Sequence, residues 1–271
     1  MCGRGVSLPP ILLLGGGRMG SAMLAGWRAQ GLAPSVVIDP APGAQALAGP
    51  DVTVVADAGA VPAGFTPGAV VLAVKPQMAN AAVPPVARFA GDALVVSIMA
   101  GRTLAGVGGL LGPAAIVRAM PNTPAAIGQG FTAAFAGPGV SPAQRALCDA
   151  MLSAVGEVAW VEAEGLIDAV TAVSGGGPAY VFLLTELLEA AAVEQGLPPD
   201  LARRLARRTV TGSGALLAAS DEEPAAMRRA VTSPAGTTER ALAVLMADDA
   251  WPALVSRAIT AATARSRELS T

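Results

Sequence analysis

Residues 11–20 read ILLLGGGRMG, a run of four branched apolar residues that leads directly into three glycines. An apolar run of this length is typical of a strand that is buried on both faces of a parallel sheet. Gly15, Gly17 and Gly20 stand at the spacing G-x-G-x-x-G, and a helix-compatible run follows at 21–30. A strand, a glycine turn and a helix in this order predict the first βα unit of a doubly wound α/β fold.

The same glycines predict a dinucleotide site. The first permits a tight turn, the second lets a pyrophosphate approach the backbone, and the third lets helix and strand pack closely. The start of the helix adds unpaired N–H groups and a positive dipole end. A chain rich in Ala and Gly also produces this spacing by chance, so a purely structural turn is the alternative. The strand before the glycines, and the helix and second strand after them, favour the dinucleotide.

Further strand-like runs alternate with helical stretches in the first part of the chain. This alternation predicts βαβ units and a mostly parallel sheet in a domain that spans residues 1–161. Ligands of such sheets bind beyond the carboxyl ends of the strands, so the turns after Val74, Ile98 and Met120 should border a nicotinamide. The predicted strands are residues 36–38, 52–55, 69–74, 94–98, 116–120, 131–135 and 157–161, with a helix at 142–154.

Asp39 ends the second predicted strand and bears on the choice of cofactor. An acid about 20 residues beyond the glycines hydrogen-bonds the adenosine ribose, whereas a 2′-phosphate requires a nearby Arg. The residues after Asp39 read PAPGAQ and carry no positive charge. Taken alone, this pattern favours NADH over NADPH. The alternative is a solvated acid at a strand end.

From about residue 162 the pattern becomes helical, which predicts an all-helical domain over residues 162–271. The stretch 178–195 is apolar around most of its circumference, and such a helix must be buried on several sides. In a small domain this predicts helices shared with a second subunit. Four arginines at 203, 204, 207 and 208 read most simply as a solvated or ion-paired face. The predicted helices are residues 178–195, 200–220, 224–230, 238–247 and 252–269.

Composition excludes several classes of function. The net charge of −2 offers no basic face for nucleic acid. Apolar runs are interrupted short of the ~18 residues of a membrane span, and residues 1–10 lack the core of a signal peptide. The chain has two cysteines, Cys2 and Cys148, which form no disulfide framework. We therefore expect a cytoplasmic protein without nucleic-acid or membrane partners.

Two residue types are informative by their scarcity. The chain has no histidine, which excludes imidazole acid/base chemistry and histidine metal ligands. We expect no metal site. Lys75 is the only lysine, so a catalytic lysine elsewhere is excluded as well.

A loop inside the helical region, VTSPAGTTERAL at 231–242, could form a carboxylate site. Pro234 and Gly236 break one helix, and Thr237 and Thr238 open the next. Hydroxyls and backbone N–H groups thus converge at a helix N-terminus. The equally weighted alternative is plain N-capping by Thr237 or Thr238.

Several motifs together make the chain resemble the pyrroline-5-carboxylate reductase family. They are AVKP at 73–76, MPNTP at 120–124, LIDAVTAVSGGGPAYVF at 166–182 and SPAGTTERAL at 233–242. The resemblance implies reduction of Δ1-pyrroline-5-carboxylate to L-proline by NADH or NADPH. It also implies a Rossmann domain followed by an α-helical domain that interlocks into a homodimer, and allows a larger ring of dimers.

The resemblance also implies residue roles. The pyrophosphate loop would be Gly15, Gly16, Gly17, Arg18, Met19 and Gly20, and the cofactor would also contact Asp39, Ala73, Val74, Lys75, Pro76 and Ala100. The substrate would be bound by Glu164, Ser233, Gly236, Thr237 and Thr238. Thr238 would be the catalytic residue, donating a hydrogen bond to the ring nitrogen. The chain departs from the family pattern at Arg18, Gly176, Ala230 and Ala235, where Asn, Ser, a polar residue and Gly are usual.

The lack of histidine is compatible with this chemistry, because hydride transfer to an imine already protonated in water needs no strong protein acid. A general imine reductase or a β-hydroxyacid dehydrogenase of the same two-domain plan is the nearest alternative. The latter class typically uses a lysine in the helical domain, and none stands there. A regulatory protein that binds NAD(P)H without turnover is a second alternative, against which the intact 233–238 loop argues.

Overall fold

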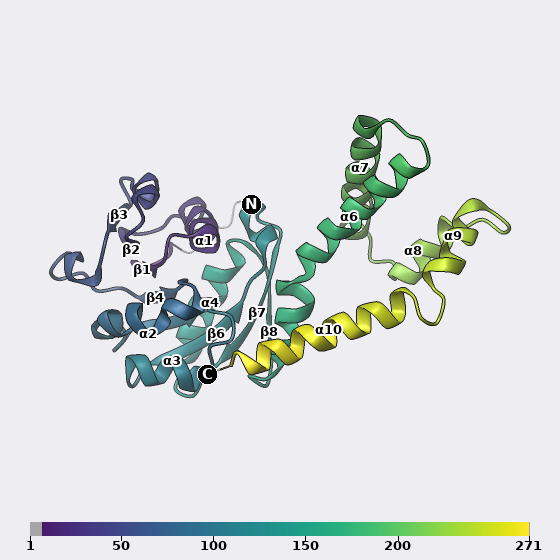
Figure 1. Cartoon of the computed structure of the whole chain (residues 1–271). Coiled ribbons are helices and arrows are strands. Elements are labelled where there is room, and N and C mark those ends of the chain that lie inside the picture. The colour runs from purple at the N-terminus through teal and green to yellow at the C-terminus, as the bar shows by residue number, and fades with distance from the viewer. Residues whose placement is uncertain (1–6, 271) are drawn as a thin grey trace. The chain divides into compact units, whose positions relative to one another are not determined.

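The computed structural model describes residues 7–270, which form two compact units (Figure 1). The first unit runs to Gly175 and includes the chain again from Ala262, and the second is Gly176–Ala261. Cys2 and most of the segment examined for a signal peptide lie outside the described residues.

The first unit is built on an eight-stranded sheet with the order β3-β2-β1-β4-β5-β6-β7-β8. Neighbouring strands are parallel except for the antiparallel pair β6 and β7, which confirms the mostly parallel sheet. Each strand lies within two residues of its expected range. The strands are β1 (Ile11–Leu14), β2 (Ser35–Ile38), β3 (Val52–Val55), β4 (Ala69–Leu72), β5 (Leu94–Ser97), β6 (Ala115–Met120), β7 (Gly130–Ala136) and β8 (Gly156–Trp160).

The central strands are apolar throughout because helices cover both faces of the sheet. Alternate residues of β1, β4 and β5 enter two separate cores. One core contains α1 (Arg18–Ala29) and α4 (Pro142–Ser153), joined by a 2.8 Å hydrogen bond from Trp27 Nε1 to the Met151 carbonyl. The other contains α2 (Ala79–Ala82) and α3 (Leu104–Leu111).

The first unit continues past the expected domain boundary at residue 161. Helix α5 (Leu166–Val170) packs on the sheet, since Ile167 clusters with Met120 and Ala133. A π-helical turn, Thr171–Gly175, then leads out of the unit. The end of α10 (Trp251–Glu268) returns to it, because Ser266 donates to Asp168. Packing thus divides the chain at Gly175, whereas the change from strands to helices falls after Trp160 as expected.

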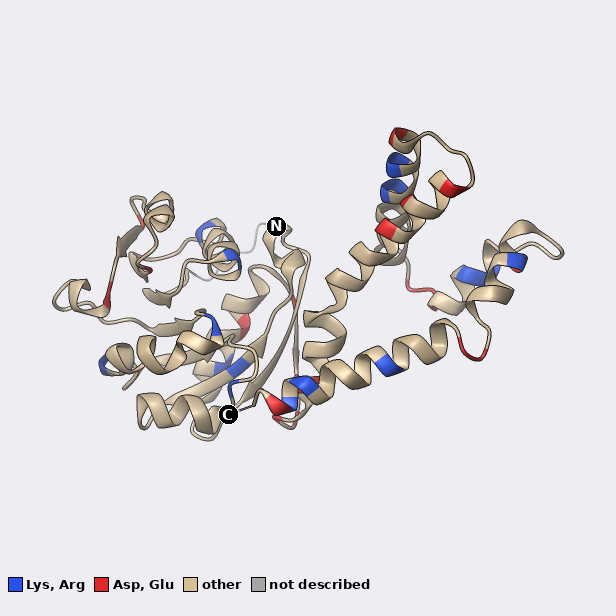
Figure 2. Ribbon diagram, viewed as in Figure 1, with Lys and Arg blue, Asp and Glu red and all other residues tan. Residues whose placement is uncertain are grey.

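The second unit contains only helices. They are α6 (Gly177–Glu194), α7 (Pro199–Ala218), α8 (Pro224–Ala230), α9 (Thr237–Leu245) and the first part of α10. Helices α6 and α7 pack as a hairpin, with an ion pair of 3.3 Å between Arg203 and Glu189. The arginines of α7 are the main charged cluster of this unit (Figure 2).

Helix α6 has no buried residue, although most of its side chains are apolar. Its exposed large apolar residues are Tyr180, Val181, Phe182, Leu183, Leu187, Leu188 and Val193. By length and composition alone the helical stretch Leu166–Glu194 could cross a membrane. Only 17% of the most apolar 18 residues in this stretch are buried. An exposed apolar surface of this size is typical of a protein–protein or membrane contact.

Candidate functional site

The glycine loop after β1 contains two glycines that the fold itself requires. Gly15 has φ +101°, and a Cβ on it would lie 2.8 Å from the Ala73 carbonyl oxygen. A Cβ on Gly20 would overlap the Gly15 carbonyl oxygen, so only glycine lets α1 pack this closely on the loop. The tight turn and the close packing predicted from the sequence are therefore both present.

Gly17 is different, because neither its φ nor a close contact with any described residue requires a glycine there. Its φ is −65°, which any residue adopts, and a Cβ built on it meets no atom within 4 Å. It precedes Arg18, the first residue of α1, and makes no side-chain cap. There is thus open space beside Gly17 at the start of α1, where the first N–H groups have no acceptor within the helix, and such a helix start suits a bound phosphate.

The remaining predicted cofactor residues lie at the same edge of the sheet. The strand ends are adjacent, since Leu14 pairs with Leu72 and Leu72 with Ser97. The strand order reverses between β1 and β4, the place where doubly wound sheets bind ligands. The turns after these strands carry Ala73, Val74, Lys75, Pro76 and Ala100, of which Lys75 and Ala100 are exposed.

A cross-link joins two of these turns. The Nη2 of Arg102 donates to the Pro76 carbonyl at 3.0 Å. The segment 98–103, called here the β5 loop, is thereby tied to the turn after β4. Sequence reasoning did not single out Arg102.

The Asp39 carboxylate binds backbone at the end of β2. One oxygen accepts from Gly16 N at 2.7 Å and the other from Ala41 N at 2.9 Å. Asp39 is therefore a support for the glycine loop and not merely a solvated acid. Its negative charge is half-buried beside that loop, and a negative charge at this position is unfavourable for a cofactor with a 2′-phosphate.

Glu164 belongs to an ion cluster that is buried at Arg118 and Asp168 and half-buried at Glu164 itself. Its Oε1 lies 3.3 Å from Nη1 of Arg118 and accepts from Leu104 N at 2.7 Å. The Arg118 Nη2 in turn pairs with Asp168 at 3.2 Å. The sequence did carry a signal for Arg118, because it is the one charged residue within the apolar strand 116–120.

The second unit holds the predicted substrate loop. Gly236 is the N-cap of α9, and Thr237 and Thr238 are its first two residues. Ala235 has φ +57° and is the only non-glycine residue with positive φ in the part of the chain that the structure describes. Its N–H donates to Oε2 of Glu239 at 2.9 Å. A Cβ on Gly236 would lie 2.5 Å from Ser233 Oγ, so the loop is closely folded at this point.

These contacts bear on the capping interpretation of the threonines, and the substrate-binding interpretation stays a prediction. Helix α9 has no side-chain cap hydrogen bond, so neither Thr237 nor Thr238 acts as an N-cap. Gly236 N donates to the Ser233 carbonyl at 3.0 Å and is not a free donor. This hydrogen bond would have to break for the Gly236 N–H to hold a carboxylate, so the expected role of Gly236 stays a prediction. The N–H groups of Thr237 and Thr238 lie in the first turn of the helix, where no carbonyl of the helix accepts them.

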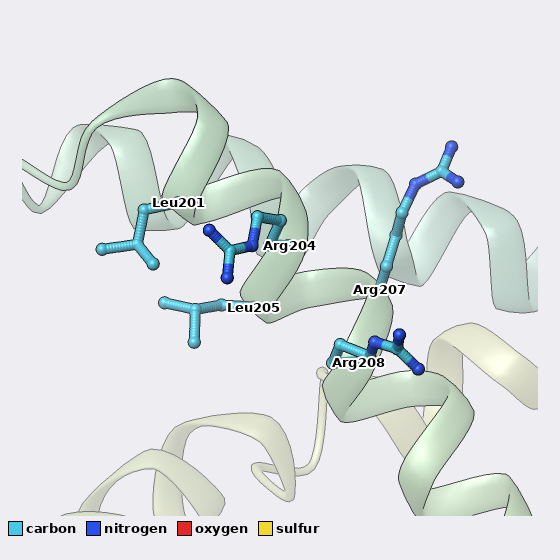
Figure 3. Close-up of a pocket in the computed structure, with 5 residues that line it drawn as sticks. All are labelled: Leu201, Arg204, Leu205, Arg207 and Arg208. Atoms are coloured by element: carbon cyan, nitrogen blue, oxygen red, sulfur yellow. The ribbon is translucent and has the colours of Figure 1, made fainter.

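Other candidate features carry no reaction chemistry. A hollow on α7 is lined by two leucines and three arginines, Leu201, Arg204, Leu205, Arg207 and Arg208 (Figure 3). Burial raises the pKa of the Cys148 thiol to about 12, so it is not a nucleophile. Within residues 7–270 no group of three or more Cys, Asp or Glu residues is placed to bind a metal.

Comparisons with known proteins find matches for both parts of the chain. Residues 164–269 match the family model for pyrroline-5-carboxylate reductase dimerisation, and residues 10–101 match that for coenzyme F420-dependent NADP oxidoreductases. The pyrroline-5-carboxylate reductase of Pseudomonas aeruginosa is 41% identical over 242 residues, which is 88% of each chain.

Solved structures extend the likeness to the whole fold. A pyrroline-5-carboxylate reductase from Coxiella burnetii matches with a TM-score of 0.88 and 33% identity over 98% of this chain and 100% of the other. The Plasmodium falciparum enzyme, solved with NADP bound, matches with a TM-score of 0.84 and 25% identity over the same shares. The glycine loop, the helical unit and these likenesses together show that the chain belongs to the pyrroline-5-carboxylate reductase family.

Proposed function

We propose that this protein reduces Δ1-pyrroline-5-carboxylate to L-proline, using NADH or NADPH, as the last step of proline synthesis in the cytoplasm. The observation that carries the proposal is Gly17, which leaves space for a phosphate at the start of α1 for no reason internal to the fold. Membership of the family supplies the substrate class.

The residues of the first unit fit a dinucleotide. The loop Gly15–Gly20, with the first N–H groups of α1, would hold the pyrophosphate. Ala73, Val74, Lys75, Pro76 and Ala100 would line the nicotinamide half, and Asp39 would face the adenosine ribose. When bound, the reduced cofactor supplies the hydride that the imine carbon accepts. The protein's part is to orient the two reactants and to exclude other geometries.

The loop of the second unit fits the carboxylate and the ring nitrogen of the substrate. The free N–H groups at the start of α9 would hold the carboxylate, together with the Ser233 and Thr237 hydroxyls. The Thr238 hydroxyl, which is not used as a cap, would donate to the ring nitrogen. A threonine hydroxyl is a poor acid at neutral pH, so its part is hydrogen bonding. The imine nitrogen carries its proton before hydride transfer.

Glu164 fits a different role from the one its motif implies. Its Oε1 is held by Arg118 and by the Leu104 N–H, and its side chain is 27% exposed. We therefore assign Glu164 to the support of the β5 loop and leave substrate contact to the 233–238 loop.

We further propose a homodimer in which a second copy covers the apolar surface of α6. The match to a dimerisation model over residues 164–269 supports this, as does the lack of any buried residue on α6. A lipid surface is the competing explanation for an apolar helix. Light scattering in detergent-free buffer separates the two, since a monodisperse dimer excludes the lipid surface. A stable and active monomer at micromolar concentration would contradict the dimer. A larger ring of dimers would appear as a multiple of the dimer mass.

The decisive experiment for the function is the initial rate of loss of reduced-cofactor absorbance on pyrroline-5-carboxylate, with NADH and with NADPH. We expect turnover with at least one of them and formation of proline. A larger cyclic imine and a β-hydroxyacid with oxidised cofactor serve as comparison substrates. Cofactor binding without turnover of any of these would identify a regulatory protein instead. Faster turnover of the comparison substrates would identify another reductase.

A further inference from the structure

Arg118 is a charged residue in the middle of the sheet. It lies on β6 between Ser97 of β5 and Phe135 of β7, and its side chain is only 2% exposed. Burying a guanidinium is costly unless charged partners surround it. Its Nε has no hydrogen-bond partner among residues 7–270, so the described surroundings leave one donor of the arginine unsatisfied.

Two carboxylates of the segment that leads into α5 and of α5 itself pair with this arginine. Glu164 accepts from Nη1 and Asp168 from Nη2, at 3.3 and 3.2 Å. A buried ion cluster is often no more stable than an apolar packing of the same volume. A gain in folding stability therefore does not explain the cluster. Its purpose is better inferred from the backbone segments that its carboxylates hold in place.

The first arm of the cluster reaches the end of the β5 loop. Besides Arg118, Glu164 Oε1 accepts the N–H of Leu104 at 2.7 Å. Leu104 is the first residue of α3 and directly follows the loop. A carboxylate at a helix N-terminus is favourable for both the free N–H groups and the helix dipole. Glu164 thus fixes the point where the loop ends.

The second arm reaches the middle of the same loop. Asp168 accepts from Ser266 Oγ at 2.8 Å, and Ser266 is 6% exposed near the end of α10. Three residues further on, Leu269 lies against Gly101. A Cβ on Gly101 would be 2.9 Å from the Leu269 Cβ and 3.0 Å from its carbonyl oxygen. The C-terminal turn of α10 is therefore packed on the loop beside Ala100.

Resting on the cofactor site proposed above, we propose that Arg118 is a positioning residue for the nicotinamide. It acts through Glu164 on one end of the β5 loop, and through Asp168 and Ser266 on the C-terminal turn that covers Gly101. The hydrogen bond from Arg102 to the Pro76 carbonyl connects the β5 loop to the turn after β4, so the position of the loop also affects that turn. The end of the helical region thereby sets the geometry of the loop that carries Ala100.

The arm through Ser266 gives the cleanest test, because Ser266 contacts no reactant in the proposed site. Ser266→Ala removes its hydrogen bond to Asp168. The matched control is Ser270→Ala, which removes a hydroxyl from the same turn that donates only to the Ser266 carbonyl, at 3.0 Å. Asp168→Asn is a second variant that removes charge with little change of shape. Gly17→Val, at the proposed pyrophosphate site, reports on the cofactor site independently.

Three measurements are made on each full-length variant: hydrogen exchange of peptides that cover residues 98–104, the Kd of the reduced cofactor, and kcat and KM for the imine. For Ser266→Ala and Asp168→Asn we expect exchange of the loop to accelerate about tenfold, the scale of one lost charge-assisted hydrogen bond. We expect kcat to fall about three- to thirtyfold through misorientation, while KM for the imine changes less than twofold. Ser270→Ala should match the wild type.

The outcomes separate the two proposals. If Ser266→Ala and Asp168→Asn only lower the melting temperature, with unchanged loop exchange and kcat, Arg118 is structural and the positioning role is refuted. If these variants alter loop exchange and Gly17→Val leaves the cofactor Kd unchanged, the loop is fixed as described but the cofactor site is misassigned. If Gly17→Val loses cofactor while both arm variants behave as the wild type, the positioning role alone fails.

Discussion

The Thr238 hydroxyl tests the proposed substrate site most directly. The residue is half-buried at the second position of α9, and that helix has no side-chain cap. Thr238→Ala therefore removes no cap, and alanine is the better helix former by about half a kcal/mol. Stability should stay constant or rise slightly. Plain N-capping would instead cost about 1 kcal/mol.

The activity of Thr238→Ala should fall, although its stability stays constant or rises. A hydrogen bond to a partly charged group is worth about 1.5–3 kcal/mol, which corresponds to a roughly 10- to 150-fold fall in kcat/KM. Thr238→Ser keeps the hydroxyl and should retain most of the activity. Thr237→Ala is the neighbouring comparison, because it removes a hydroxyl assigned to the carboxylate and should raise KM more than it lowers kcat.

The assay is the initial rate of reduced-cofactor oxidation on pyrroline-5-carboxylate, corrected for the folded fraction measured by thermal unfolding. A Thr238→Ala enzyme with wild-type kcat/KM would refute the reasoning, and the ring nitrogen would then need another donor. A fall in stability of about 1 kcal/mol with full activity would instead restore the capping interpretation.

Three further outcomes follow from the contacts. Gly17→Val should fold normally, since its Cβ meets nothing within 4 Å, but should raise the Kd of the reduced cofactor by at least about tenfold; an unchanged titration would remove the pyrophosphate site. Asp39→Ser should weaken both cofactors by releasing Gly16 N, yet raise the NADPH-to-NADH ratio of kcat/KM about tenfold by removing charge; a wild-type preference for NADPH of similar size would contradict this. Ala235→Gly should raise the melting temperature by about 1–3 °C, because alanine at φ +57° is strained, whereas the control Ala226→Gly inside α8 should lower it; equal losses in both variants would argue against strain.

The glycine loop shows how far local sequence can be interpreted. The order of strand, glycines and helix predicted the Rossmann half, and the parallel strands formed where apolar runs stood. Each such element depends on neighbours within a few residues, so its pattern is visible in the chain. The single charge in strand 116–120 was equally visible, but its partners Glu164 and Asp168 lie far along the sequence, and so does Ser266, which donates to Asp168.

By itself the sequence determined the fold class, the family and the set of residues at the strand ends, because these follow from periodicity, glycine spacing and motifs. Only the tertiary structure shows that the first compact unit runs to Gly175 and also includes the end of α10. The reason is that the boundary of a packed unit need not coincide with the change from strands to helices. Tertiary structure alone decided that Gly236 N–H is already used and that Thr238 is no cap, because such hydrogen bonds depend on φ and ψ at Ala235 and its neighbours. It alone gave Glu164 an arginine as its partner, because that contact spans 46 residues and two elements that only the folded sheet brings together.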